Sequence, residues 1–215
     1  MLVGVRLIFI WEMRMSLRFI TGVAVALAIA STPALACKGR NVAFSDDFSS
    51  EDPAWAGGDF TISNGRLQLK SDEGKLAIVV YEGDTLEAGD VCLDVIAPDY
   101  RGGGSAFAGI LFGFGGQNLH AMWVSPADGT VGVAALKKGK WANPVPARKS
   151  DAIKQQANAV NTLRLTWKGG DGTGYVNDKQ FAKFKIQPVP DANHFGIYAQ
   201  TEGKVWQFDN YKVTD

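Results

Sequence analysis

The segment Asn161–Lys168, NTLRLTWK, alternates apolar and polar side chains with a period of two. Leu163, Leu165 and Trp167 lie on one side of an extended chain, and the polar residues between them lie on the other. A strand with this pattern has one buried face and one wet face, which is typical of antiparallel sheets. The segment therefore predicts a half-buried antiparallel strand.

The same alternation recurs along the chain after residue 36, separated by turns rich in Gly, Asn and Asp. The alternating segments include Arg66–Lys70, Asp90–Val95, Leu119–Trp123 and Val131–Ala135. We predict an all-β protein of about 12–13 antiparallel strands, arranged as a sandwich or barrel. The one helix that we predict is short, Ser150–Gln156, with Ser150 as its cap.

Two segments depart from simple alternation. Ser105–Phe114 is apolar on both sides, which predicts a central strand that is covered on both faces. Near the end of the chain, Trp206 and Phe208 alternate, and the phase then shifts to Tyr211 and Val213. Such a shift predicts a β-bulge at Asp209-Asn210.

Residues 1–36 have the three parts of a secretory signal peptide. Arg18 precedes the apolar run Phe19–Ala30, and an A-x-A cleavage site ends at Ala36. Translation is expected to start at Met13 or Met15, and the alternative is one long signal-anchor. We therefore expect residues 37–215 to form a single domain that is periplasmic or secreted.

The two cysteines, Cys37 and Cys92, both follow the predicted cleavage site. In an exported protein, this pair predicts a disulfide. The bond would close a loop of about 56 residues and stabilise the fold by roughly 4 kcal/mol. The alternatives are two free thiols, or lipidation of Cys37, although Ala34 stands where a lipobox usually has Leu. No spacing of Cys and His predicts a metal site.

The charge balance argues against partners that bind by bulk electrostatics. Removing residues 1–36 takes away 3 of 22 basic and 1 of 22 acidic residues, which leaves a net charge of about −2. We therefore expect no nucleic-acid binding, and no membrane association after cleavage.

Several short sequence segments occur in an order that resembles that of a known superfamily. They are Asp46-Asp47-Phe48, Asp90–Val95, Ala108–Phe112, Asn161–Leu165, Tyr175–Asp178, Phe195–Ala199 and Phe208–Val213. From Phe44 to Asp215 the chain resembles the concanavalin A-like jelly-roll superfamily, and within it most resembles the domain called 3-keto-disaccharide hydrolase. The resemblance implies a β-sandwich and contact with carbohydrate, but it transfers no catalytic residue.

One motif invites a catalytic interpretation. Glu82–Glu87 matches E-x-D-x-x-E, the spacing of retaining family 16 glycoside hydrolases. We interpret the segment instead as a solvated loop, because Gly83 lies inside the motif and apolar strands flank it. His194 and His120 lack a nearby nucleophile-elbow motif, so we predict no catalytic residue.

Aromatic side chains suggest binding, because sugar rings stack on them. Trp167 and Trp206 are predicted to lie in the core, whereas Trp141 is expected in an exposed loop. The predicted ligand-binding residues are Tyr100, His120, Trp123, Trp141 and Arg148.

We predict no cofactor, and the exception to consider is a structural calcium ion at Asp46, Asp47 and Asp209. The leading hypothesis is an exported carbohydrate-binding module. The alternatives are a glycoside-cleaving enzyme related to 3-keto-disaccharide hydrolases, and a non-catalytic envelope module that contacts proteins.

Overall fold

The computed structural model describes residues 37–70, 72, 75–99, 106–187, 193–200 and 203–215. All of them belong to one compact unit, Pro33–Asp215. The predicted signal peptide, 1–36, and Tyr100 lie outside the described residues. No helix among the described residues is long and apolar enough to cross a membrane.

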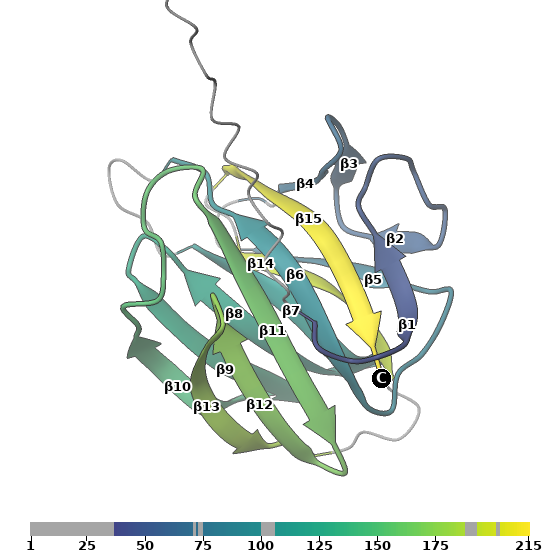
Figure 1. The fold of residues 1–215 in the computed structure, drawn as a ribbon, viewed down its shortest axis with the longest axis vertical. Coiled ribbons are helices and arrows are strands. Elements are labelled where there is room, and N and C mark those ends of the chain that lie inside the picture. Colours follow the sequence, from purple (N-terminus) through teal and green to yellow (C-terminus); the bar gives the residue numbers. More distant parts are fainter. Residues whose placement is uncertain (1–36, 71, 73–74, 100–105, 188–192, 201–202) are drawn as a thin grey trace, which may run out of the picture. The chain divides into compact units, whose positions relative to one another are not determined.

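The described residues contain fifteen strands and no helix (Figure 1). The strands exceed the predicted number partly because β2 (Trp55–Gly57) and β3 (Phe60–Ile62) are three residues long, too short to show alternation. The predicted helix at Ser150–Gln156 is wrong. Turns occupy this segment, in which the amide of Ile153 donates to the carbonyl oxygen of Ser150.

Sheet A has eight strands, all paired antiparallel. Its order is β13-β12-β11-β6-β15-β4-β3, and β1 pairs with β15. The bounds not yet given are β13 Lys179–Lys185, β12 Asp171–Val176, β11 Val160–Lys168, β6 Gly89–Ile96, β15 Val205–Thr214, β4 Leu67–Lys70 and β1 Val42–Asp46.

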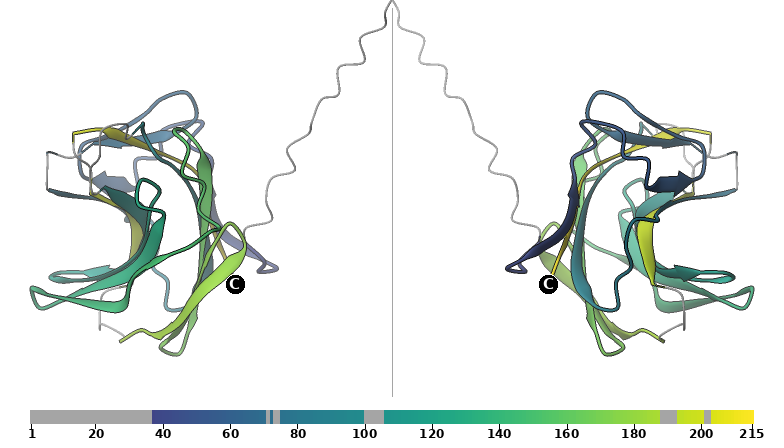
Figure 2. Two further views of the ribbon diagram at one scale, coloured as in Figure 1. Left: turned by 90° about the vertical axis from the view of Figure 1, so that its left-hand side faces the viewer. Right: turned by 90° about the vertical axis from the view of Figure 1, so that its right-hand side faces the viewer.

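Sheet B has seven antiparallel strands in the order β10-β9-β8-β7-β14-β5-β2. Their bounds are β10 Lys140–Lys149, β9 Thr130–Lys137, β8 Asn118–Ser125, β7 Phe107–Gly115, β14 His194–Gln200 and β5 Leu76–Tyr81. The two sheets form two layers, and sheet B curves so that its outer face is the concave side (Figure 2).

The main core lies between the sheets, as the alternation predicts. Leu163, Leu165 and Trp167 are buried in it, whereas the residues between them are only partly buried. The predicted bulge is also confirmed, because the register of β15 on β6 shifts between Asp209 and Lys212. Asn210 has a φ of 53° there. The bulge lets both halves of β15 direct aromatic rings into the same core.

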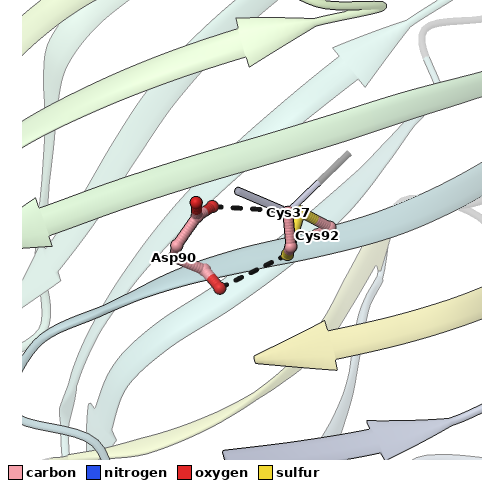
Figure 3. Close-up of side chains that lie close together, drawn as sticks. All are labelled: Cys37, Asp90 and Cys92. Atoms are coloured by element: carbon pink, nitrogen blue, oxygen red, sulfur yellow. Dashed lines mark hydrogen bonds between the residues drawn. A yellow bond between two sulfur atoms is a disulfide. The ribbon is translucent and has the colours of Figure 1, made fainter. Parts of the chain in front are cut away.

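The predicted disulfide between Cys37 and Cys92 is confirmed, with a Cα–Cα distance of 5.6 Å. It fixes Cys37 to the outer face of sheet A, beside Asp90 (Figure 3). Asp90 in turn accepts from the amide of Lys38 at 3.0 Å and from the guanidinium of Arg164 at 2.7 Å. Because the sulfur of Cys37 is used in this bond, it is not available for lipidation.

Strand β10 forms one edge of sheet B and pairs irregularly with β9. The register shifts between Ala142 and Val145 and again between Val145 and Arg148. Pro144 and Pro146 stand in this irregular part. Proline lacks the amide hydrogen of a regular ladder, so it is tolerated at a sheet edge or a bulge.

Candidate functional site

The outer face of sheet B carries a second apolar cluster, separate from the main core. Its buried members are Val80, Leu111, Leu119, Ala121 and Tyr198, and its partly buried members are Ile78, Phe107, Phe114, Trp123 and Leu136. Strand β7 therefore has apolar side chains on both faces, as predicted for Ser105–Phe114. An antiparallel sheet usually has polar side chains on its outer face, so this face needs a separate explanation.

Strand register and a glycine bring a tryptophan flat onto this face. Trp123 on β8 lies opposite Gly132 on β9 and Gly109 on β7. A Cβ atom added to Gly132 would lie 2.6 Å from Cζ2 of Trp123. The indole therefore lies across Gly132, in space that any other residue would occupy with its side chain.

Three rings from three strands follow one another across the face. The ring centroids of Trp123 and Phe107 are 5.2 Å apart. Phe107 also stacks on Tyr198, with centroids 5.7 Å apart and an interplanar angle of 19°. We call Trp123, Phe107 and Tyr198 the aromatic row. Burial raises the pKa of the Tyr198 phenol above its ordinary value.

Trp141 lies on the same face, at the edge of the sheet. It pairs with Leu136, which pairs with Leu119, and both leucines belong to the outer cluster. Its side chain is 53% exposed. The prediction that Trp141 lies in a loop is wrong, because it is part of strand β10, but its predicted exposure is confirmed.

His120 faces the other way, toward the main core. It pairs with Phe112, stacks on that ring with centroids 5.3 Å apart, and is 6% exposed. It lines a cavity of about 60 Å³ together with Trp167. Among the residues that the structure describes, its buried Nδ1 has no hydrogen-bond partner. Burial, and secondarily the charge of Lys137, lower the pKa of His120.

Arg148 also lies away from the aromatic row. It pairs with Val131, a residue of the main core, and donates to the carbonyl oxygen of Phe181 on β13 at 3.3 Å. Of the predicted site residues, the structure thus brings Trp123 and Trp141 onto one face. His120 and Arg148 do not join them.

Sequence reasoning missed Phe107 and Tyr198 as site residues. Both lie in segments that had been noted for other reasons, the doubly apolar Ser105–Phe114 and the phrase Phe195–Ala199. The signal that could have found them is that Ser105–Phe114 is apolar on both sides. We interpret the second apolar side, from sequence, as covered by other parts of the protein.

The carboxylates considered for catalysis lie in an exposed connection between β5 and β6. Glu82, Asp84 and Glu87 are all exposed, and no strand runs through this segment. The interpretation of the motif as a solvated acidic loop is confirmed.

The aspartates considered for calcium have local roles. Asp46 accepts from the amide of Phe48 at 2.7 Å and from Nε1 of Trp55 at 2.7 Å. Burial raises the pKa of Asp209. In the part of the chain that the structure describes, the one group of three possible ligand residues is Cys37, Asp90 and Cys92, whose sulfurs form the disulfide. A calcium ion at Asp46, Asp47 and Asp209 stays a prediction.

No protein-family model and no curated protein matches this sequence. Solved structures do match. The carbohydrate-binding module CBM66 from Bacillus subtilis has a TM-score of 0.63 at 15% identity, covering 75% of this chain and 96% of its own. A protein of unknown function with a galectin-like fold from Bacillus subtilis has a TM-score of 0.62 at 10% identity, covering 83% and 97%. The laminarinase catalytic domain from Thermotoga maritima has a TM-score of 0.60 at 12% identity, covering 83% and 99%.

These neighbours confirm the predicted fold, a concanavalin A-like jelly-roll sandwich. At such identities, the likeness concerns the fold alone. The closer resemblance to the 3-keto-disaccharide hydrolase domain stays a prediction.

Proposed function

We propose that this protein is an exported carbohydrate-binding module, and that the ligand lies on the outer face of sheet B. The observation that carries this proposal is the aromatic row of Trp123, Phe107 and Tyr198, with Trp141 exposed on the same face. Sugar rings present apolar C–H faces, which stack favourably on aromatic side chains.

The spread of the rings favours an extended ligand. Trp123 on β8 and Phe107 on β7 are partly exposed, Tyr198 on β14 is buried and supports them, and Trp141 adds an exposed position on β10 at the edge of the sheet. Several stacking positions on one sheet suit an oligosaccharide better than a single sugar. The sheet is concave on this side, which lets a chain contact more than one ring (Figure 2).

The comparisons support a role with carbohydrate, since the neighbours include a carbohydrate-binding module and a laminarinase catalytic domain. Export is supported by the disulfide, because such bonds persist mainly in oxidising compartments. A relation to 3-keto-disaccharide hydrolases would add cleavage to binding. Glu82 and Glu87 lie exposed in a loop and are not arranged as a catalytic pair in a cleft.

Titration of tryptophan fluorescence with neutral hexasaccharides, including laminarihexaose and cellohexaose, tests the proposal. Trp141→Ala should weaken binding by about 1–3 kcal/mol, the usual cost of removing a stacked ring. Tyr175→Ala is the matched control, because this ring lies on sheet A beneath Arg164, and binding should change less than about twofold.

Binding by Trp141→Ala as tight as that of the parent would contradict the proposed site, as would no binding of any hexasaccharide. Chromatography of the same mixtures reports cleavage. Shortened products would replace the binding-only function with the enzymatic one.

A further inference from the structure

The hairpin of β9 and β10 carries a run of positive charge. Between Gly129 and Ser150 the chain has five basic residues and no acidic residue. We call Thr130–Lys149 the cationic hairpin. Its basic residues are Lys137, Lys138, Lys140, Arg148 and Lys149.

Carboxylates do not neutralise these charges. Lys137 donates to Oε1 of Gln187 at 2.7 Å, and Lys149 donates to the main-chain oxygen of Asp128. Arg148 likewise bonds a main-chain oxygen. Within the described residues, none of the five cations has a carboxylate within 4.0 Å. Their field therefore extends into the solvent over about one Debye length, near 8–10 Å.

Neighbouring lysines behave differently. On β13, Lys185 pairs with Asp171 at 2.6 Å, and Lys179 pairs with Asp151. Lys183, between them on the same strand, has no ion pair among the described residues, so β13 is partly neutralised, whereas none of the five cations of the cationic hairpin is paired.

Acidic residues are concentrated in one segment of the sequence. From Asn41 to Gly65 the chain has five acidic residues and no basic residue. This segment includes β2, and β2 and β10 are the two edges of sheet B (Figure 1). None of the five acidic residues lies on β2 itself, and Asp46 belongs to β1 of sheet A.

The exposed tryptophan lies within the positive edge. Trp141 directly follows Lys140 on β10, and it is the most exposed large apolar side chain of the hairpin, at 53%. Lys149 shares the face of Trp141 and Lys138 lies in the turn of the hairpin, whereas Lys140 and Arg148 alternate to the other face. The hairpin therefore offers a stacking surface together with unpaired cations, chiefly Lys138 and Lys149. A sugar ring that bears an acidic group would use both.

We propose that the cationic hairpin binds the acidic groups of a carboxylated glycan whose ring stacks on Trp141. This inference rests on the proposed function and specifies its ligand class. A nucleic acid fits less well, because proteins that bind it commonly have a strongly basic domain, whereas this chain has a pI of about 6.7.

The experiment compares binding of hexagalacturonate with that of neutral galactohexaose. The test variant combines Lys138→Gln, Lys140→Gln and Lys149→Gln. The control variant combines Lys70→Gln, Lys154→Gln and Lys168→Gln, which are exposed lysines outside the hairpin. Both variants change the net charge equally, so a difference between them reports the position of the charges.

We expect the parent to bind hexagalacturonate at least tenfold more tightly than galactohexaose. The hairpin variant should lose about tenfold in affinity for the acidic probe, and the control variant less than about threefold. Raising the salt concentration from 50 to 200 mM should weaken binding of the acidic probe by about tenfold and leave the neutral probe nearly unchanged.

Equal binding of both probes would overturn the acidic-ligand inference while leaving the proposed function intact. If the protein bound neither of these probes and none of the neutral hexasaccharides, the proposed function would be defeated as well. Equal losses in the two variants would show that net charge matters and the hairpin does not. If a single-stranded DNA hexamer bound more tightly than hexagalacturonate, the cationic hairpin would be a nucleic-acid-binding surface, and the inference would be wrong.

Discussion

The outer faces of the two sheets differ in how their side chains are satisfied. On sheet A, the guanidinium of Arg164 bonds Asp90 at 2.7 Å and lies 4.8 Å from the ring centre of Tyr175. The polar side chains of that face bond one another, and the disulfide holds Cys37 against it. On sheet B, Trp123 and Trp141 offer ring faces to the outside. The difference accords with the proposal that sheet B carries the binding face, while sheet A carries the disulfide and a self-paired polar face.

Removing the disulfide tests the structural side of this comparison and should have the largest effect. Cys37→Ala with Cys92→Ala should lower the free energy of unfolding by about 4 kcal/mol, because the open chain gains entropy when unfolded. Denaturation in guanidinium chloride measures the loss. The parent under reducing conditions is the control and should behave alike. A loss below about 1 kcal/mol would show that the bond does not stabilise sheet A.

Leu111→Ala tests whether the outer face of sheet B is packed like a core. Leu111 is 0% exposed although it points away from the other sheet, so its truncation should cost about 2–4 kcal/mol. Thr173→Ala, on the polar outer face of sheet A, is the matched control and should cost less than about 0.5 kcal/mol. Similar costs at both positions, measured by urea denaturation, would remove the contrast between the two faces.

Gly132→Ala sharpens the comparison at the aromatic row. The new methyl group would meet the indole of Trp123, so we expect a loss of about 2 kcal/mol and a shift in tryptophan emission. In a Trp123→Ala background the same change should cost clearly less, because the ring is gone and only the contact of the new methyl group with the carbonyl oxygen of Val145, at 3.1 Å, remains. An equal cost in both backgrounds would mean that the strain arises in the backbone instead.

The smallest expected effect concerns His120, on the inner side of sheet B. Its pKa is lowered in the folded protein, so the unfolded chain binds more protons near the ordinary value of 6.5. The contribution of the neutral His120 to the free energy of unfolding is therefore fully present above pH 6.5, and it is lost as the pH drops below that value. Thermal midpoints between pH 7.5 and 5.5 should decline in the parent and decline less in His120→Leu. Identical slopes would contradict the assignment, since His194 is present in both proteins.

The sequence predicted those features that depend on one strand at a time. Alternation in Asn161–Lys168 identified the buried side of β11, and the phase shift after Phe208 located the bulge. The disulfide was predicted from two cysteines that follow a predicted export signal. Alternation and its phase shift are local properties of one strand, and two cysteines allow only one pairing. None of these features requires knowledge of the neighbouring strands.

The candidate site depended on pairing between strands, which a single sequence does not reveal. The β8 pattern shows that His120 and Trp123 face opposite ways, but apolar residues accompany both, so the inner side stays undecided. The row of Phe107, Trp123 and Tyr198 exists because register aligns three distant segments. Trp141 resembled a loop residue because prolines follow it, and an edge strand tolerates them.

Those prolines have a consequence for how the molecule behaves among its own copies. An exposed edge strand normally presents a row of free amide and carbonyl groups to any passing chain. Pro144 and Pro146 remove two donors from β10, and the shifted register bends the remaining ladder out of step. A ligand that contacts the side chains of β10 can therefore approach this edge. A strand of another molecule, in contrast, finds no regular row of backbone groups with which to pair and so start aggregation.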